Sequence, residues 1–113
     1  MGSFARLLGQ AMPTDTTAVT IYTKPVDAVV FLDQIIVCNT SGGTPTYRIF
    51  HDDDGATYAT SNALFYDVPM VANTSVIIDI KGSLYTALGT IGVRSSSGND
   101  ITFTLYGEEV FQS

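Results

Sequence analysis

The chain has 113 residues, of which 45% are apolar and only 14% charged, and its formal net charge is −6. This length allows one domain with a hydrophobic core but excludes two domains of ordinary size. Nucleic-acid binding normally needs a stripe of basic side chains, and the five basic residues are scattered along the chain, so the composition argues against a nucleic-acid partner.

The first 15 residues differ in character from the rest of the chain. They include the apolar side chains of Phe4, Leu7 and Leu8 but have no candidate partner strand nearby in the sequence. They lack the long apolar stretch of a signal peptide, and no run in the chain approaches the ~20 apolar residues that span a bilayer. We therefore predict an N-terminal arm or edge strand over residues 1–15, a β-sandwich domain over residues 16–113, and no membrane partner.

Short β-type runs, separated by turn residues, follow this segment. They lie at Ala18–Thr23, Ala28–Asn39, Thr44–Asp52, Ala63–Pro69, Thr74–Ile80, Gly89–Ser95 and Asp100–Val110. The last run alternates cleanly, with Ile101, Phe103 and Leu105 on one side of the strand. Strands at such short intervals, with turn residues between them, are typical of sandwiches and barrels. The sequence therefore predicts an all-β fold: a single antiparallel β-sandwich, jelly-roll-like, of seven to eight strands with an N-terminal arm.

The run Ala28–Asn39 stands out because apolar residues occupy both faces of the expected strand. Such a run predicts a strand that is buried. The polar pair Asp33-Gln34 interrupts the run and predicts a β-bulge or a bend. Cys38, the single cysteine, lies in the same run, where a small buried thiol is expected, and it excludes an intrachain disulfide.

The next stretch, IFHDDDGATY at residues 49–58, holds the densest cluster of potential ligand side chains. A calcium loop of the EF-hand type, with its central glycine at Gly55, would place its first ligand at Phe50 and its twelfth at Ser61. The motif therefore fails at both ends. Aspartates followed by glycine also form turns, in which the glycine takes a positive φ. We interpret Asp52–Asp54 as an exposed turn, with a weak surface cation site and a contact surface as the alternatives.

Catalytic motifs are missing from the sequence. The only histidine, His51, and Cys38 would form the one candidate base and nucleophile, but Cys38 is expected to be buried. The chain has no G-x-S-x-G elbow, no zinc quartet and no phosphate-binding glycine loop. We therefore predict no catalytic residues, no metal, no cofactor and no enzymatic activity.

The chain has six tyrosines, which admit three interpretations: half-buried sheet positions, a protein interface, or a sugar-binding surface. They are Tyr22, Tyr47, Tyr58, Tyr66, Tyr85 and Tyr106. Half-buried sheet positions are the simplest of the three, because tyrosine is common in strands.

Three stretches carry a resemblance to a known family of proteins. They are LGQAMPTDTTAVTIYTKP, IIVCNTSGGTPTYRIF and FTLYGEEV. They resemble small virion-associated β-proteins encoded among the structural genes of tailed bacteriophages, and the resemblance spans roughly Leu7 to Glu109. It includes no active site and does not extend to the HDDDG stretch.

The resemblance implies a virion protein that is made in the cytoplasm of a bacterial host. Its members look like capsid decoration (cement) proteins or other virion accessory proteins. The expected function is to bridge and stabilise capsomers, with the major capsid protein or other virion proteins as partners. We expect a homo-oligomer, with a trimer favoured because the threefold points of a capsid suit closed symmetry. The alternatives are a tail, neck or baseplate adaptor and a host receptor- or carbohydrate-binding module.

The contact with a neighbouring subunit is predicted to come from the N-terminal segment. The residues chosen are Phe4, Arg6, Leu7 and Leu8. An arm that orders on assembly must recover its entropy cost from that contact, and apolar side chains are suited to provide it.

Overall fold

The computed structural model describes residues 2–86 and 88–112, and in them the chain forms nine strands and one short 3₁₀ helix. The strands are β1 (Gly2–Ala11), β2 (Val19–Thr23), β3 (Ala28–Asn39), β4 (Thr46–Asp52), β5 (Ala63–Pro69), β6 (Ser75–Asp79), β7 (Ser83–Leu84), β8 (Thr90–Ser95) and β9 (Ile101–Phe111), and the helix η1 is Thr60–Asn62. In these residues no helix has the length and apolar character needed to cross a membrane.

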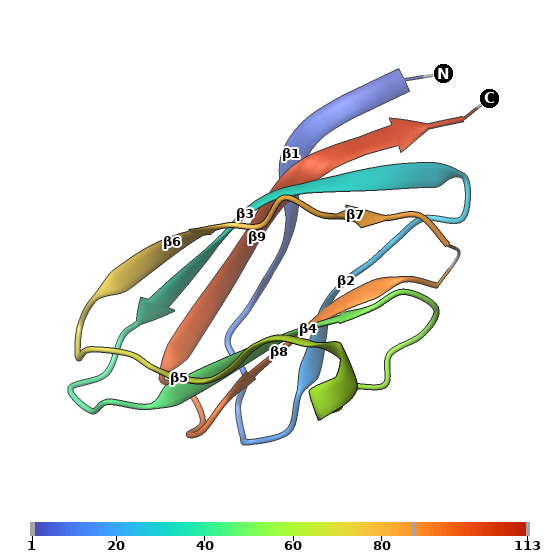
Figure 1. Cartoon of the computed structure of the whole chain (residues 1–113). Helices are drawn as coiled ribbons and strands as arrows, with labels where there is room; N and C mark the ends of the chain where they lie inside the picture. The colour runs from blue at the N-terminus through green and yellow to red at the C-terminus, as the bar shows by residue number, and fades with distance from the viewer. Residues whose placement is uncertain (1, 87, 113) are drawn as a thin grey trace.

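The strands form two antiparallel sheets that face each other (Figure 1). Sheet A has the order β1-β9-β3-β6, with β7 also paired to β3, and sheet B has the order β2-β8-β4-β5. Because β6 and β7 pair with successive parts of β3, they occupy one position of the sheet. The sandwich then has eight strand positions in the order of a jelly roll. The predicted fold class, an antiparallel jelly-roll-like β-sandwich, is confirmed.

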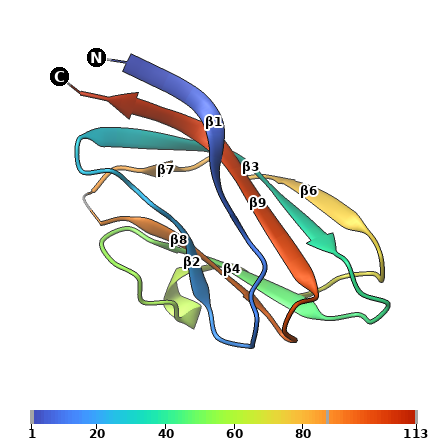
Figure 2. The same cartoon turned by 180° about the vertical axis from the view of Figure 1, so that it is seen from behind.

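The first strand, β1, lies at one edge of sheet A and pairs with β9 from Gly2–Phe111 to Ala11–Phe103. The start of β1 and the end of β9 therefore lie side by side (Figure 2). The sequence offered no partner for residues 1–15 because that partner is the last strand of the chain. The division between residues 15 and 16 stays a prediction about which part folds alone.

The core lies between the sheets, and strand alternation fills it. Ile101, Phe103 and Leu105 of β9 are fully buried, as their alternation predicted. The bulge predicted at Asp33-Gln34 is also present, because the register of β3 against β9 shifts between Leu32 and Gln34. Inward side chains of β3, such as Ile35, are likewise fully buried.

The prediction that β3 is buried on both sides is wrong for its outward face. Phe31 is 49% exposed, and Cys38, which also points outward, is only half-buried. The outward residues are nevertheless apolar at Val29, Phe31 and Ile36. Within the described part of the chain, however, only the inner face is covered by another sheet.

Candidate docking surface

Strand alternation separates the four residues predicted to contact a neighbouring subunit. Leu8 packs against the core between the sheets. Phe4 also lies on the inner side of β1, where its ring makes an edge-on contact with Phe111 at 6.1 Å between centroids. Leu7 lies opposite Tyr106 and points outward. The four side chains therefore do not form one surface.

Arg6 is engaged within the chain by a buried carboxylate. Its Nη1 lies 3.3 Å from Oε1 of Glu109, whose side chain is only 6% exposed. The hydroxyl of Tyr22 donates a hydrogen bond to the other carboxylate oxygen. Burial, with the Glu109 carboxylate beside the hydroxyl, raises the pKa of Tyr22. This cluster joins β1, β2 and β9, and Arg6 supplies the positive charge that a buried carboxylate needs.

The outer side of sheet A presents an apolar surface that no described part of the chain covers. Leu7 and Tyr106 form a cross-strand pair on it, and Ile77 of β6 is 66% exposed. Its members share an outward position on β1, β3, β6 or β9. We call this set the apolar outer face: Leu7, Val29, Phe31, Ile36, Ile77, Tyr106 and Val110.

Two β-bulges hollow the apolar outer face near its centre. The register of β1 shifts between Leu7 and Gly9, and the register of β3 shifts at Asp33, on the two sides of β9. Two adjoining shallow hollows, of about 370 and 290 Å³, lie between them. Ala5 lines both hollows, and Tyr106 lines the larger one. Charged side chains, Arg6, Asp33 and Glu108, line the hollows as well. Such a concave surface of mixed character can receive side chains of a partner protein.

The outer side of sheet B is covered by the chain itself. Tyr58, from the loop after β4, lies across Gly92, where a side-chain carbon would come within 2.4 Å of its ring. The ring stacks on Phe50 at 5.5 Å between centroids. Its hydroxyl is hydrogen-bonded to Thr20 Oγ1 at 2.7 Å and to Thr90 Oγ1 at 2.8 Å. The loop is therefore fixed to strands β2, β4 and β8.

The HDDDG stretch begins this covering loop, and Asp52 organises it. The Asp52 carboxylate accepts backbone N–H bonds from Thr57 at 2.7 Å and from Asp54 at 3.2 Å. These bonds, above all the one from Thr57, lower the pKa of Asp52. Asp53 and Asp54 are exposed, as predicted for a turn, but Asp52 is only 8% exposed. The expectation that all three face solvent is wrong, because the first caps its own loop.

Two further expectations about this stretch are answered by the structure. Gly55 does not supply the bend through a positive φ, since no described glycine has one. His51 and Cys38 lie on different sheets, with His51 on β4 and the outward-facing Cys38 on β3, so they do not form a nucleophile and base pair. Within residues 2–86 and 88–112, no three His, Cys, Asp or Glu side chains are grouped as metal ligands.

Charged side chains on sheet B are paired with one another. Arg48 and Arg94 lie opposite each other on β4 and β8, and Asp67 interacts with both. The Asp67 carboxylate accepts hydrogen bonds from Arg48 Nε at 2.6 Å and from Arg48 Nη2 at 3.2 Å, and Arg94 Nη1 lies 3.9 Å from its Oδ1. The Arg48 hydrogen bond lowers the pKa of Asp67. Arg48 also lies 3.9 Å from the centroid of the Tyr66 ring, in a cation–π contact.

The tyrosines do not gather on one surface. Tyr47 is buried in the core, whereas Tyr106 lies on the apolar outer face and Tyr85, after β7, is 73% exposed. Tyr22, Tyr58 and Tyr66 make the contacts described above. Two of the six, Tyr22 and Tyr58, are half-buried, so the simplest of the three interpretations holds for only part of the set.

No family model matches the chain, and no curated protein matches it. Among solved structures, it is similar to a chain in the crystal structure of the T13 IBDV viral particle, with a TM-score of 0.58 and 8% identity over 97% of this chain and 30% of that one. It is also similar to a chain in the structure of infectious bursal disease virus Gx strain, with a TM-score of 0.54 and 10% identity over 96% of this chain and 32% of that one.

At these identities the likeness shows the fold alone. The chain spans about a third of the length of the chains that it matches. The β-sandwich described here is therefore one that also occurs as part of chains in a virus particle.

Proposed function

We propose that the chain is a structural protein of a virion and that it docks on another virion protein through its apolar outer face. The observation that carries this proposal is β3, whose outward side chains are apolar on both sides of its Asp33-Gln34 bulge although no described residue covers them. Apolar surface of this extent is characteristic of protein contact sites. The fold, shared with chains of a virus particle, supports the same role.

Within this role we propose capsid decoration, in which the protein bridges and stabilises capsomers of a tailed bacteriophage. The resemblance of the three sequence stretches to virion-associated phage β-proteins supports this choice. The partner would be the major capsid protein or another virion protein, the assembly a trimer, and the site of synthesis the cytoplasm of the bacterial host. The role is structural and not enzymatic.

Of the N-terminal residues first predicted for the contact, Leu7 is the one on the apolar outer face. We propose that Leu7 contributes directly to docking. Arg6 and Leu8 contribute by fixing β1 to the body of the sandwich, through Glu109 and the core respectively. Phe4 lies on the inner side of β1 against Phe111 and is not part of this contact.

Cryo-electron microscopy of the source particle tests this proposal. We expect density for the chain on the capsid shell, in hundreds of copies, with sheet A turned toward a neighbouring protein. Density restricted to the tail, neck or baseplate, in a ring-sized number of copies, would reject decoration in favour of an adaptor. A chain seated through sheet B, with sheet A facing solvent, would reject the docking surface itself.

A further inference from the structure

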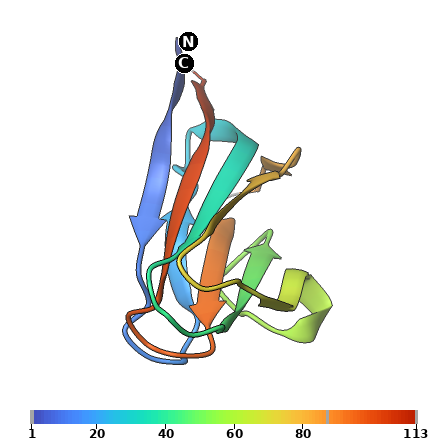
Figure 3. The ribbon, with the colours of Figure 1, turned by 90° about the vertical axis from the view of Figure 1, so that its left-hand side faces the viewer.

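The sandwich is closed along one edge and open along the other. At the closed edge, β1 approaches β2 so nearly that a side-chain carbon at Gly9 would lie 2.1 Å from the carbonyl oxygen of Ile21. From there the two sheets spread apart toward β5 and β6–β7 (Figure 3). A cavity of about 310 Å³ lies at the open edge. Its volume is within the range of small-molecule sites in proteins.

Backbone irregularities on both sides keep this edge open. In sheet A, β6 ends at Asp79 and β7 begins at Ser83. The three residues between them stay attached to β3, since Ile80 N–H donates to Asp33 O at 3.0 Å and Gly82 O accepts from Leu32 N–H at 2.8 Å. In sheet B, the register of β5 against β4 shifts twice. Neither strand presents a regular row of backbone groups here, and they do not pair with each other.

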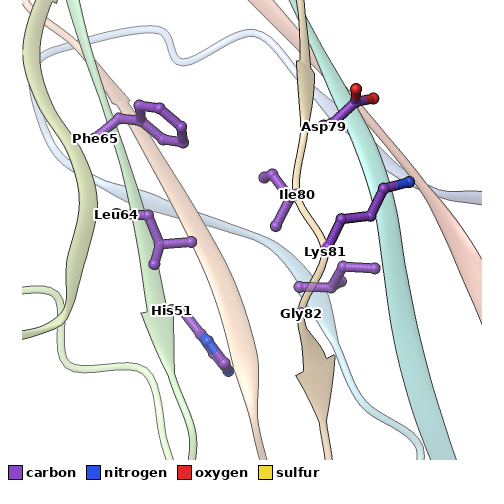
Figure 4. A pocket seen from close by; sticks show the side chains of 8 residues that line it. His51, Leu64, Phe65, Asp79, Ile80, Lys81 and Gly82 are labelled. Atoms are coloured by element: carbon purple, nitrogen blue, oxygen red, sulfur yellow. The ribbon is translucent and has the colours of Figure 1, made fainter.

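The walls of the cavity are mostly apolar and come from both sheets. Leu64 and Phe65 of β5 lie on one side with His51, and Ile80 and Gly82 lie on the other (Figure 4). The remaining wall residues are Leu32, Asp79 and Lys81. Both charge signs occur at the rim, so its charge selects neither an anion nor a cation.

One polar atom within these walls has no partner. The Nε2 atom of His51 is buried and makes no hydrogen bond with any described residue. Buried polar atoms in native proteins are nearly always hydrogen-bonded, because an unpaired one is costly. An imidazole nitrogen can act as donor or acceptor according to its tautomer. Apart from the charged groups of Asp79 and Lys81 at the rim, the cavity therefore combines apolar walls with one unpartnered nitrogen.

We propose that this cavity binds a small amphipathic molecule, a short aliphatic chain with one hydroxyl or carboxylic acid headgroup that hydrogen-bonds His51 Nε2. The aliphatic part lies against Leu32, Leu64, Phe65 and Ile80. The cavity is too small for a helix or a folded segment of a partner. This inference does not depend on the proposed virion role, because the cavity faces the open edge and not the apolar outer face.

Binding is tested by titrating the purified protein with octanol, octanoic acid and octane, followed by NMR correlation spectra and thermal melting. We expect saturable shifts at Leu64, Phe65, Ile80 and the His51 imidazole. The melting temperature should rise with probe concentration, because the probe binds the folded state. Octanol or octanoic acid should bind more tightly than octane. Absence of saturable binding by both headgroup probes would overturn the proposal.

A cavity-filling variant localises the site. Leu64 is 43% exposed at the rim, so Leu64→Trp can place its larger ring in the cavity without rebuilding the core. We expect its affinity for octanol to be at least tenfold weaker. Ile77→Trp, on the outer side of sheet A, is the matched control and should bind as the unmodified protein does. Equal binding by the Leu64→Trp protein would place the probe elsewhere and overturn the assignment.

A second variant tests the headgroup contact. His51→Leu removes the buried nitrogen and keeps most of the volume. Loss of one hydrogen bond should weaken octanol and octanoic acid binding about tenfold and leave octane unchanged. An unchanged preference for octanol over octane would show that His51 does not hold the headgroup. In the virion, a side chain of a neighbouring protein seated in the cavity would also overturn a small-molecule ligand.

Discussion

The two outer faces of the sandwich differ in how they are covered. Sheet B carries its own cover, because the loop after β4 lays Tyr58 across Gly92 and against Phe50. Sheet A has no such loop among the described residues, and its outward side chains include Phe31 at 49% and Ile77 at 66% exposure. The outer face of sheet B is therefore partly covered within the chain, whereas no described residue covers the apolar outer face of sheet A. On the proposed function, the outer face of sheet A is covered by another molecule.

The loop that covers part of sheet B is held in place by hydrogen bonds within the loop itself. The loop that covers sheet B begins with Asp52, whose carboxylate holds the backbone of Thr57 in place. It ends in η1, where Asn62 Oδ1 accepts the backbone N–H of Ala59 at 2.9 Å. These local bonds hold the loop on both sides of Tyr58. No described segment of the chain crosses the outer side of sheet A in this way.

The largest expected effect comes from charging the uncovered face. In the double variant Phe31→Glu/Ile77→Glu, two apolar contacts of roughly 1.5–3 kcal/mol each are lost from the docked state. We expect affinity for the source particle to fall about a hundredfold or more, measured by co-sedimentation of the purified protein with particles lacking it. The melting temperature should change little, since both side chains are exposed in the free chain.

A double variant with the same charge change is the control. Val26 and Val71 are 81% and 69% exposed and lie in loops outside the apolar outer face, so Val26→Glu/Val71→Glu should dock normally. Undiminished docking of the Phe31→Glu/Ile77→Glu protein would contradict the proposal that the outer face of sheet A binds a partner. Equal loss in both double variants would point to general charge repulsion instead.

The next largest effect is expected when Tyr58 is displaced from the outer face of sheet B. In Gly92→Val, the new side chain takes the place of the Tyr58 ring, because three ring carbons lie between 2.4 and 2.6 Å from the position that its Cβ would occupy. The ring must leave, with its stacking on Phe50 and its hydrogen bonds to two threonines. We expect the free energy of unfolding to fall by about 2 to 3 kcal/mol, measured by denaturant unfolding.

A double-mutant cycle tests whether this loss of stability is caused by the displacement of Tyr58. Tyr58→Ala alone should cost a similar amount, and the combination with Gly92→Val should cost little more than either change alone. Gly42→Ala is the control glycine substitution, because nothing lies within 4 Å of its Cβ position. Full additivity of Gly92→Val and Tyr58→Ala would mean that the loop is not held by the ring.

Much of the difference between the two outer faces could be predicted from the sequence, because it depends on local residue patterns. The alternation in β9 gave the correct core face, and the polar pair at Asp33 gave the bulge. The apolar residues on both faces of β3 predicted burial on both sides, which is right for the inner face and wrong for the outer face within the described residues. Gly92, inside a β-type run, was also a signal, since glycine within a strand often marks a close approach.

The remaining features depend on contacts between distant parts of the chain. β1 pairs with the last strand, and Tyr58 meets Gly92 far along the sequence, so no local pattern connects them. The open edge and its cavity result from the angle between two sheets. The division of the predicted contact residues, in contrast, follows from alternation alone, because neighbours such as Arg6 and Leu7 on one strand face opposite sides.

The smallest expected effect concerns how Asp52 holds the covering loop. Its pKa is lowered below the ordinary value of 3.8 by the N–H groups that it accepts. A carboxyl group with a lowered pKa stabilises the folded state above the unfolded-state pKa, and this contribution is lost as the pH falls through the folded-state value. Asp52→Asn should therefore lower the melting temperature modestly at neutral pH. The two proteins should converge only as the pH falls below 3.8 and through the lowered folded-state pKa of Asp52, where the unmodified carboxyl also becomes neutral.

Asp53→Asn separates this effect from a general change in charge. Asp53 is the exposed neighbour of Asp52, and its carboxylate makes no hydrogen bond with the described residues. Its substitution should leave the pH dependence of melting unchanged. Hydrogen exchange gives a second readout, because the Thr57 amide should exchange faster only in the Asp52→Asn protein. If Thr57 exchange were unaffected, the loop would be held on sheet B by Tyr58 alone, and the cover would depend on packing more than on the aspartate turn.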